Sequence, residues 1–97
     1  THVYDGQADF ADRFETPSQT LPVIIGEFGP ASGYMTEADC TALMDSADTL
    51  QIPYLAWTFH QRCPPNLLVE NSGGGCGVDM DLAPTSWGQL LMNRLAP

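Results

Sequence analysis

Residues 21–28 read LPVIIGEF, an almost continuous apolar run that is rich in β-branched side chains. A second run of this kind, IPYLAWTF, occupies residues 52–59. Neither run alternates between polar and apolar residues, and uninterrupted apolar runs are typical of strands covered on both faces in a parallel sheet. We therefore predict a strand in each run, and we interpret His2-Val3-Tyr4 as the end of a third strand.

Helical patterns separate these runs. Thr36 is a good N-cap residue, with Asp39 three positions later as in a capping box, and apolar residues follow at helical spacing. This pattern predicts a helix over residues 36–50. A second apolar stripe predicts a helix over residues 84–95, and a weaker pattern predicts a short helix over residues 8–15.

The predicted elements follow the order strand, helix, strand, helix, strand, long loop, helix. Repeated βα units with parallel strands form either a doubly wound sheet or a section of a (β/α)8 barrel. The chain has 97 residues, which allows one small domain. No change in composition marks a boundary, so we predict an α/β fold with a single segment over residues 1–97.

The charge of the chain excludes several kinds of partner. Asp and Glu number 12 against 3 Lys and Arg, which gives a formal net charge of -9. A phosphate backbone or an anionic lipid surface would be repelled, so we expect neither nucleic acid nor membrane as a partner. The apolar runs are also too short to span a bilayer. Neutral polymers, small molecules and sugars remain as candidate ligands.

The positions of the three cysteines indicate the cellular compartment of the protein. Cys63 and Cys76 flank a stretch rich in Pro, Asn and Gly, which a disulfide bond would stabilise by about 3 kcal/mol. The alternative is a pair of unpaired thiols; a zinc site is less well supported, because the spacing of ligands is wrong. A disulfide implies an oxidising compartment, either extracellular or periplasmic. Cys40 is then the remaining thiol, expected inside a helix and buried.

Candidate functional residues follow the predicted strands. Functional groups of parallel α/β folds lie at the carboxyl ends of the strands. Glu27 is at such an end, although a structural carboxylate there is an equally good interpretation. Trp57 ends the next strand and is either a core residue or a stacking platform for a sugar. His2 and Tyr4 are two residues apart, so both point to the same side of a strand.

These motifs together resemble a known family. The sequence LPVIIGEFG at residues 21–29, preceded by His2-x-Tyr4 and followed by Leu55-Ala56-Trp57, resembles the C-terminal part of a family 5 glycoside hydrolase of the cellulase type. Residues 85–90 also resemble the start of the last helix in that family. The resemblance covers essentially the whole chain and implies a partial (β/α)8 barrel with strands six to eight and their helices.

The resemblance implies an activity and a role for each residue. It implies a retaining endo-β-1,4-glucanase that needs no cofactor and no metal. Glu27 is then the nucleophile, Tyr4 donates a hydrogen bond to it, His2 contacts the sugar, and Trp57 forms the floor of a sugar subsite. A retaining glycosidase holds its two carboxyl groups about 5 to 5.5 Å apart, so a second, protonated carboxyl group is also required.

That second group is missing from this chain. The family carries its general acid in an Asn-Glu-Pro sequence, and no Asn-Glu pair is present here. Nothing in the context of Glu15 or Glu70 supports either as a substitute, so we assign no general acid. An alternative function is therefore a non-catalytic carbohydrate-binding or assembly fragment.

The expected partners follow from the same interpretation. The ligand is a β-glucan polysaccharide or oligosaccharide, and we expect secretion. The chain opens at Thr1 without an initiator Met or a signal peptide, so we expect a processed or truncated piece. Three βα units leave open strand edges, so we expect self-association or binding to the missing N-terminal part of the barrel.

Overall fold

The computed structural model describes residues 1–70 and 82–97. The chain divides into two compact units, Thr1–Ala56 and Trp57–Pro97, which are described separately. The first unit contains three strands, one α-helix and three short helical turns: β1 (His2–Val3), η1 (Gln7–Asp9), η2 (Ala11–Glu15), η3 (Pro17–Gln19), β2 (Ile25–Phe28), α1 (Glu37–Leu50) and β3 (Tyr54–Ala56). The second unit contains α2 (Ser86–Leu95).

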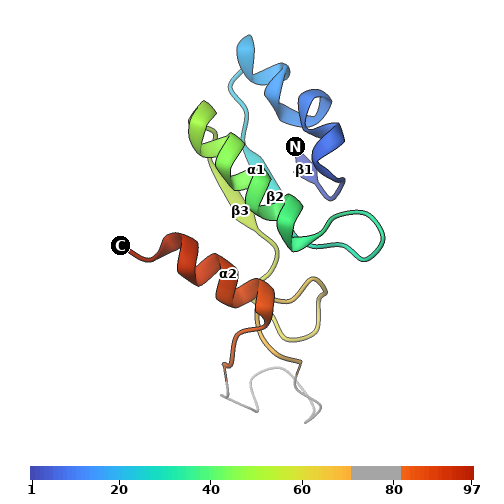
Figure 1. The fold of residues 1–97 in the computed structure, drawn as a ribbon, viewed down its shortest axis with the longest axis vertical. Helices are drawn as coiled ribbons and strands as arrows, with labels where there is room; N and C mark the ends of the chain where they lie inside the picture. Colours follow the sequence, from blue (N-terminus) through green and yellow to red (C-terminus); the bar gives the residue numbers. More distant parts are fainter. Residues whose placement is uncertain (71–81) are drawn as a thin grey trace. The chain divides into compact units, whose positions relative to one another are not determined.

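The first unit is built around a parallel sheet. Its strand order is β1-β2-β3, and both neighbouring pairs are parallel. Figure 1 shows α1 lying along this sheet, with the η1–η3 segment following β1. Because all three strands run the same way, their carboxyl ends share one edge of the sheet. The residues after β1, β2 and β3 therefore begin their loops at that edge.

The strands are shorter than the apolar runs that predicted them. β2 begins at Ile25 and not at residue 21, and β3 covers only Tyr54–Ala56 of the predicted residues 52–59. Each run has a proline at its second position, which has no N–H to donate to a neighbouring strand. Leu21 belongs to the preceding turn and not to the strand, because its N–H donates a hydrogen bond to the carbonyl of Pro17 at 3.0 Å.

An irregularity in β2 decides which way its side chains point. Ile25 pairs with Tyr54 and Phe28 pairs with Ala56, so β2 has one residue more than β3 between the two pairs. This is the pattern of a β-bulge, which re-aims side chains. Ile25 and Phe28 would lie on opposite faces of a regular strand, but both are fully buried here. Glu27 is thereby left on the other side, outside the core.

The core of the first unit lies between α1 and the sheet. The buried positions of α1 are Cys40, Leu43, Met44 and Ala47, and the fully buried strand residues are Val3, Ile25 and Phe28. The predicted helix is confirmed, because Thr36 and Asp39 form the expected capping box. Cys40 is buried as expected, and burial raises the pKa of its thiol to about 12. This thiol is therefore protonated and unreactive in the folded chain.

The segment over residues 8–15 is helical but is not an α-helix. It consists of the 3₁₀ turn η1 and the π-helical turn η2, in which the N–H of Thr16 donates to the carbonyl of Ala11 at 2.9 Å. Phe10 and Phe14 still lie on one side of it, with ring centroids 5.3 Å apart, and both rings are buried. The apolar spacing thus identified the buried face correctly, while the hydrogen-bond pattern differs from the prediction.

The second unit is organised by α2. The helix predicted over residues 84–95 is confirmed, and the structure shows Thr85 as its N-cap: its hydroxyl accepts a hydrogen bond from the N–H of Gly88 at 3.0 Å. The same hydroxyl donates to the carbonyl of Asn66 at 2.7 Å, which ties the helix start to the preceding segment. Trp87 is buried, and its indole N–H donates to the carbonyl of Trp57 at 2.9 Å. The loop after Trp57 is therefore fixed to the first turn of α2.

Candidate functional site: a carboxylate at the carboxyl edge of the sheet

Glu27 lies in the central strand of the sheet, one residue before its end. The hydroxyl of Tyr4 donates a hydrogen bond to Glu27 Oε2 at 3.1 Å. His2 Nδ1 lies 3.2 Å from the same oxygen. The structure therefore brings together three of the four residues that the sequence singled out, all within the first unit.

Strand register explains this cluster. His2 is directly opposite Glu27 in the β1–β2 pair, and Tyr4 follows two residues later on the same side. Gly26 leaves room for the imidazole, because a Cβ atom at this position would lie 3.4 Å from His2 Nε2. A side chain at position 26 would therefore pack against the imidazole ring.

The cluster is accessible to a ligand. The side chain of Glu27 is 27% exposed and that of His2 is 59% exposed. Tyr4 and His2 both contact Oε2, and among the described residues nothing is hydrogen-bonded to Glu27 Oε1. One carboxylate oxygen is thus held in place while the other is available.

The proton of Tyr4 is held firmly. Burial raises the pKa of the Tyr4 phenol well above its ordinary value, and the hydrogen bond to Glu27 and the negative charge of that carboxylate raise it further. A phenol in this state is a hydrogen-bond donor over the whole physiological range. Its proton therefore stays available for the hydrogen bond to Glu27 Oε2.

We expect Glu27→Gln to lower the pKa of Tyr4, because the substitution removes the negative charge and weakens the hydrogen bond. The part of the shift that comes from burial should remain. Ultraviolet titration of the phenolate, with Tyr4→Phe to identify the signal, measures this directly. Because the pKa of Tyr4 is raised on folding, its contribution to stability is present below about pH 10 and is lost as the pH rises through the folded pKa. An unchanged Tyr4 titration in Glu27→Gln would contradict the contact.

Asp39 holds the surrounding loops together, a role that the sequence did not reveal. Its Oδ2 accepts hydrogen bonds from the N–H and the hydroxyl of Thr36, at 2.8 and 2.7 Å. Its Oδ1 accepts from the N–H of Gln7 at 3.1 Å, which joins the loop after β1 to the start of α1. Chiefly the bond from the Thr36 backbone lowers the pKa of Asp39. The capping box is visible in the sequence, but the bond to Gln7 joins residues 32 positions apart.

The remaining predicted residues belong to the second unit. Trp57 is its first residue, and its carbonyl accepts the indole N–H of Trp87 as described above. Cys63 is exposed, and Cys76 lies outside the described residues, so the disulfide bond stays a prediction. The side-chain amide of Asn66 bonds the backbone, accepting from the Cys63 N–H at 2.7 Å and donating to the Gln61 carbonyl at 3.1 Å.

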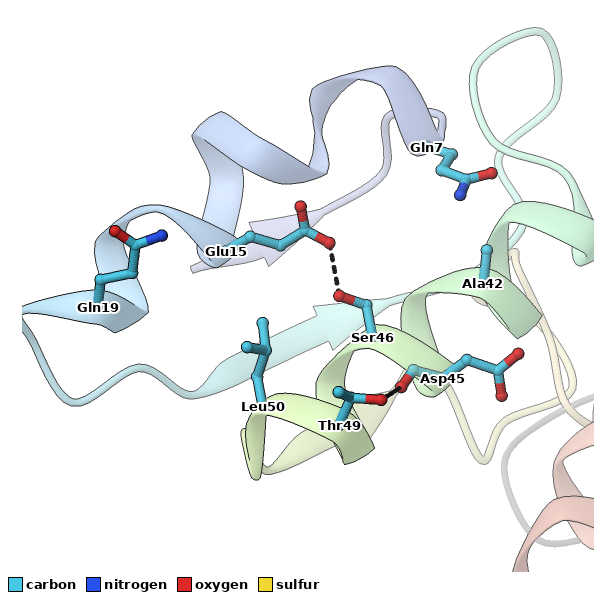
Figure 2. Close-up of a pocket in the computed structure, with 8 residues that line it drawn as sticks. All are labelled: Gln7, Glu15, Gln19, Ala42, Asp45, Ser46, Thr49 and Leu50. Atoms are coloured by element: carbon cyan, nitrogen blue, oxygen red, sulfur yellow. Dashed lines mark hydrogen bonds between the residues drawn. The ribbon is translucent and has the colours of Figure 1, made fainter.

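A separate open pocket of about 500 Å³ lies between the η1–η3 segment and α1. Figure 2 shows its lining, in which the hydroxyl of Ser46 donates to Glu15 Oε1 at 2.5 Å. The lining residues are Gln7, Glu15, Gln19, Ala42, Asp45, Ser46, Thr49 and Leu50. None of His2, Tyr4 and Glu27 is among them. Glu15 is engaged in this pocket, so its contacts give no support for a role as the missing acid.

Within residues 1–70 and 82–97, no three His, Cys, Asp or Glu side chains gather as a metal site. Across the same residues no helix is both long and apolar enough to cross a membrane. In comparisons with known proteins, no family model matches this chain, and neither curated proteins nor solved structures give a match.

Proposed function

We propose that the chain is the C-terminal βα section of a secreted, retaining glycoside hydrolase that cleaves β-1,4-glucan. In this proposal β1, β2 and β3 are strands six to eight of a (β/α)8 barrel, and Glu27 is the nucleophile. One observation carries it: a partly exposed carboxylate at the carboxyl edge of a parallel sheet, with one oxygen held by Tyr4 and His2 and the other available. In barrel enzymes, active sites lie at this edge.

The geometry suits a nucleophilic carboxylate. Tyr4 and His2 orient the Glu27 carboxylate through Oε2, which leaves Oε1 to attack the anomeric carbon of a bound sugar. Attack forms a glycosyl ester with Glu27 and expels the leaving-group oxygen. Water then cleaves the ester and releases the sugar with its original anomeric configuration. His2, more than half exposed beside the carboxylate, is placed to contact a sugar hydroxyl during these steps.

The chain does not itself supply the acid that protonates the leaving group, because it has no Asn-Glu-Pro sequence. We propose that the acid comes from another chain or segment that completes the barrel. The same observation favours the second candidate function, in which the chain alone binds glucan without cleaving it. In that case the cluster around Glu27 serves recognition.

Hydrolysis of 2,4-dinitrophenyl β-cellobioside separates these two functions. This leaving group departs without protonation, so a nucleophile alone is sufficient. We expect the chain to release dinitrophenol slowly. We expect no detectable hydrolysis of methyl β-cellobioside, whose leaving group is not activated. Binding of a soluble glucan without release of dinitrophenol would reject the nucleophile and support the binding function.

We also expect the chain to self-associate, or to bind the part of a barrel that it lacks. Leu55 in the middle of β3 is 62% exposed and Ile24, directly before β2, is 58% exposed, so both lie outside the core. Apolar side chains on an uncovered sheet face favour association. Size-exclusion chromatography with light scattering should give at least twice the monomer mass, and Leu55→Lys should reduce it. A monomer at every concentration would contradict self-association, while Leu50→Lys on α1 is the control.

A further inference from the structure

Tyr34 is a large aromatic residue held on the surface. The residue is 74% exposed, whereas Met35 beside it is buried. It lies in the loop between β2 and α1, which leaves the carboxyl edge of the sheet (Figure 1). Exposed aromatic rings on a loop that a scaffold holds in place are characteristic of binding surfaces.

The backbone of this loop is ordered by its own hydrogen bonds. The N–H groups of Tyr34 and Met35 both donate to the carbonyl of Ala31, each at 2.9 Å. Gly33 has a φ of 80°, a left-handed conformation that closes the turn and that glycine adopts without strain. On the other side the buried Met35 side chain and the Thr36 cap fix the loop to α1. The backbone of the loop is therefore ordered before a ligand contacts Tyr34, which lowers the entropy cost of binding.

The loop also lies close to the segment that carries Tyr4. A Cβ atom at Gly6 would lie 3.5 Å from the carbonyl oxygen of Tyr34. Two residues span at most about 7 Å, so the Tyr34 carbonyl is within about 12 Å of the Tyr4 Cα. A short oligosaccharide can cover this distance. The Asp39 bonds to Thr36 and to Gln7 hold the two loops at this separation.

We propose that Tyr34 is a stacking platform for a pyranose ring of a β-glucan chain, at a subsite beyond the ring that reacts with Glu27. The proposal rests on the proposed function and adds a second sugar contact to the same edge of the sheet. The apolar face of a pyranose packs against the phenol ring, so the aromatic ring is needed and the hydroxyl is not.

Isothermal titration calorimetry with cellohexaose tests this on the whole chain. We expect Tyr34→Ala to weaken binding about tenfold, equivalent to about 1.4 kcal/mol, and Tyr34→Phe to bind within about twofold of the original chain. Leu21→Ala is the matched control, because Leu21 is similarly exposed but precedes β2, at the opposite edge of the sheet. It should not change the affinity.

Two results would overturn the platform: equal cellohexaose affinity in Tyr34→Ala and the original chain, or no binding by the original chain. Circular dichroism of Tyr34→Ala checks that the fold is kept. The outcome is independent of the nucleophile. If Glu27→Gln leaves hydrolysis unchanged while Tyr34→Ala still weakens binding, the platform stands and the proposed function of Glu27 fails.

Discussion

Glu27→Gln should lower the rate of dinitrophenyl β-cellobioside hydrolysis by about a thousandfold or more. The amide has nearly the same shape as the carboxylate but cannot form the glycosyl ester, so the loss reflects chemistry and not packing. A thousandfold loss corresponds to about 4 kcal/mol in activation free energy. Initial rates of dinitrophenol release, followed by absorbance, measure the effect.

Glu15→Gln is the control for this substitution. It also replaces a glutamate of the first unit, but one that accepts a hydrogen bond from Ser46, whereas Tyr4 and His2 contact Glu27. Its rate should match that of the original chain. A second test replaces Glu27 by Gly and adds azide, which can attack the anomeric carbon in place of the carboxylate, forming a glycosyl azide and releasing dinitrophenol. Hydrolysis that survives Glu27→Gln unchanged would reject the assignment.

Gly88→Ala should destabilise the second unit by about 3 kcal/mol, the upper range for overpacking of a closely packed site. Helix propensity alone predicts the opposite, since Ala favours a helix over Gly by about 1 kcal/mol. We expect packing to outweigh helix propensity, so that the substitution lowers the stability. A Cβ atom at position 88 would lie 2.0 Å from the carbonyl oxygen of Leu67 and 3.1 Å from Pro84 Cβ. Because the carbonyl belongs to the backbone, α2 has to move away.

That movement also strains the bond from the Thr85 N–H to the Leu67 carbonyl, which is 2.9 Å long. Urea unfolding followed by tryptophan fluorescence reports on this unit, because both Trp57 and Trp87 belong to it. Met92→Ala is the control: Met92 is exposed on the same helix, and we expect a change within about 0.5 kcal/mol. Equal stability of Gly88→Ala and the original chain would show that α2 does not pack as described.

The sequence predicted the helices of this fold better than its strands. Thr36 and Thr85 define helix starts through local hydrogen bonds, which depend on residues three positions away. The extent of a strand depends instead on its neighbours. The run at residues 21–28 yields only four strand residues, and the extra residue of β2 opposite β3 becomes apparent only from the pairing. The hydrophobic periodicity of the sequence does not indicate this extra residue.

The candidate site was predictable only where it depends on residues that are close in the sequence. The spacing of His2 and Tyr4 places them on one side of a strand, and the structure brings both to Glu27 Oε2. The availability of Oε1 and the link from Asp39 to Gln7 depend on contacts between distant segments. Tyr34 had a weak signal, an aromatic residue within a loop rich in Gly, Pro and Ser. Its exposure is visible only in the fold.

Covalent trapping tests the central claim most directly. A 2-deoxy-2-fluoro β-cellobioside with a dinitrophenyl leaving group forms the glycosyl ester of a retaining enzyme but slows its hydrolysis. We predict that mass spectrometry finds one fluorocellobiosyl group per chain, on the peptide that contains Glu27, and none in Glu27→Gln. Release of dinitrophenol without an adduct on Glu27, or an adduct on another carboxylate, would contradict the role of Glu27 as nucleophile.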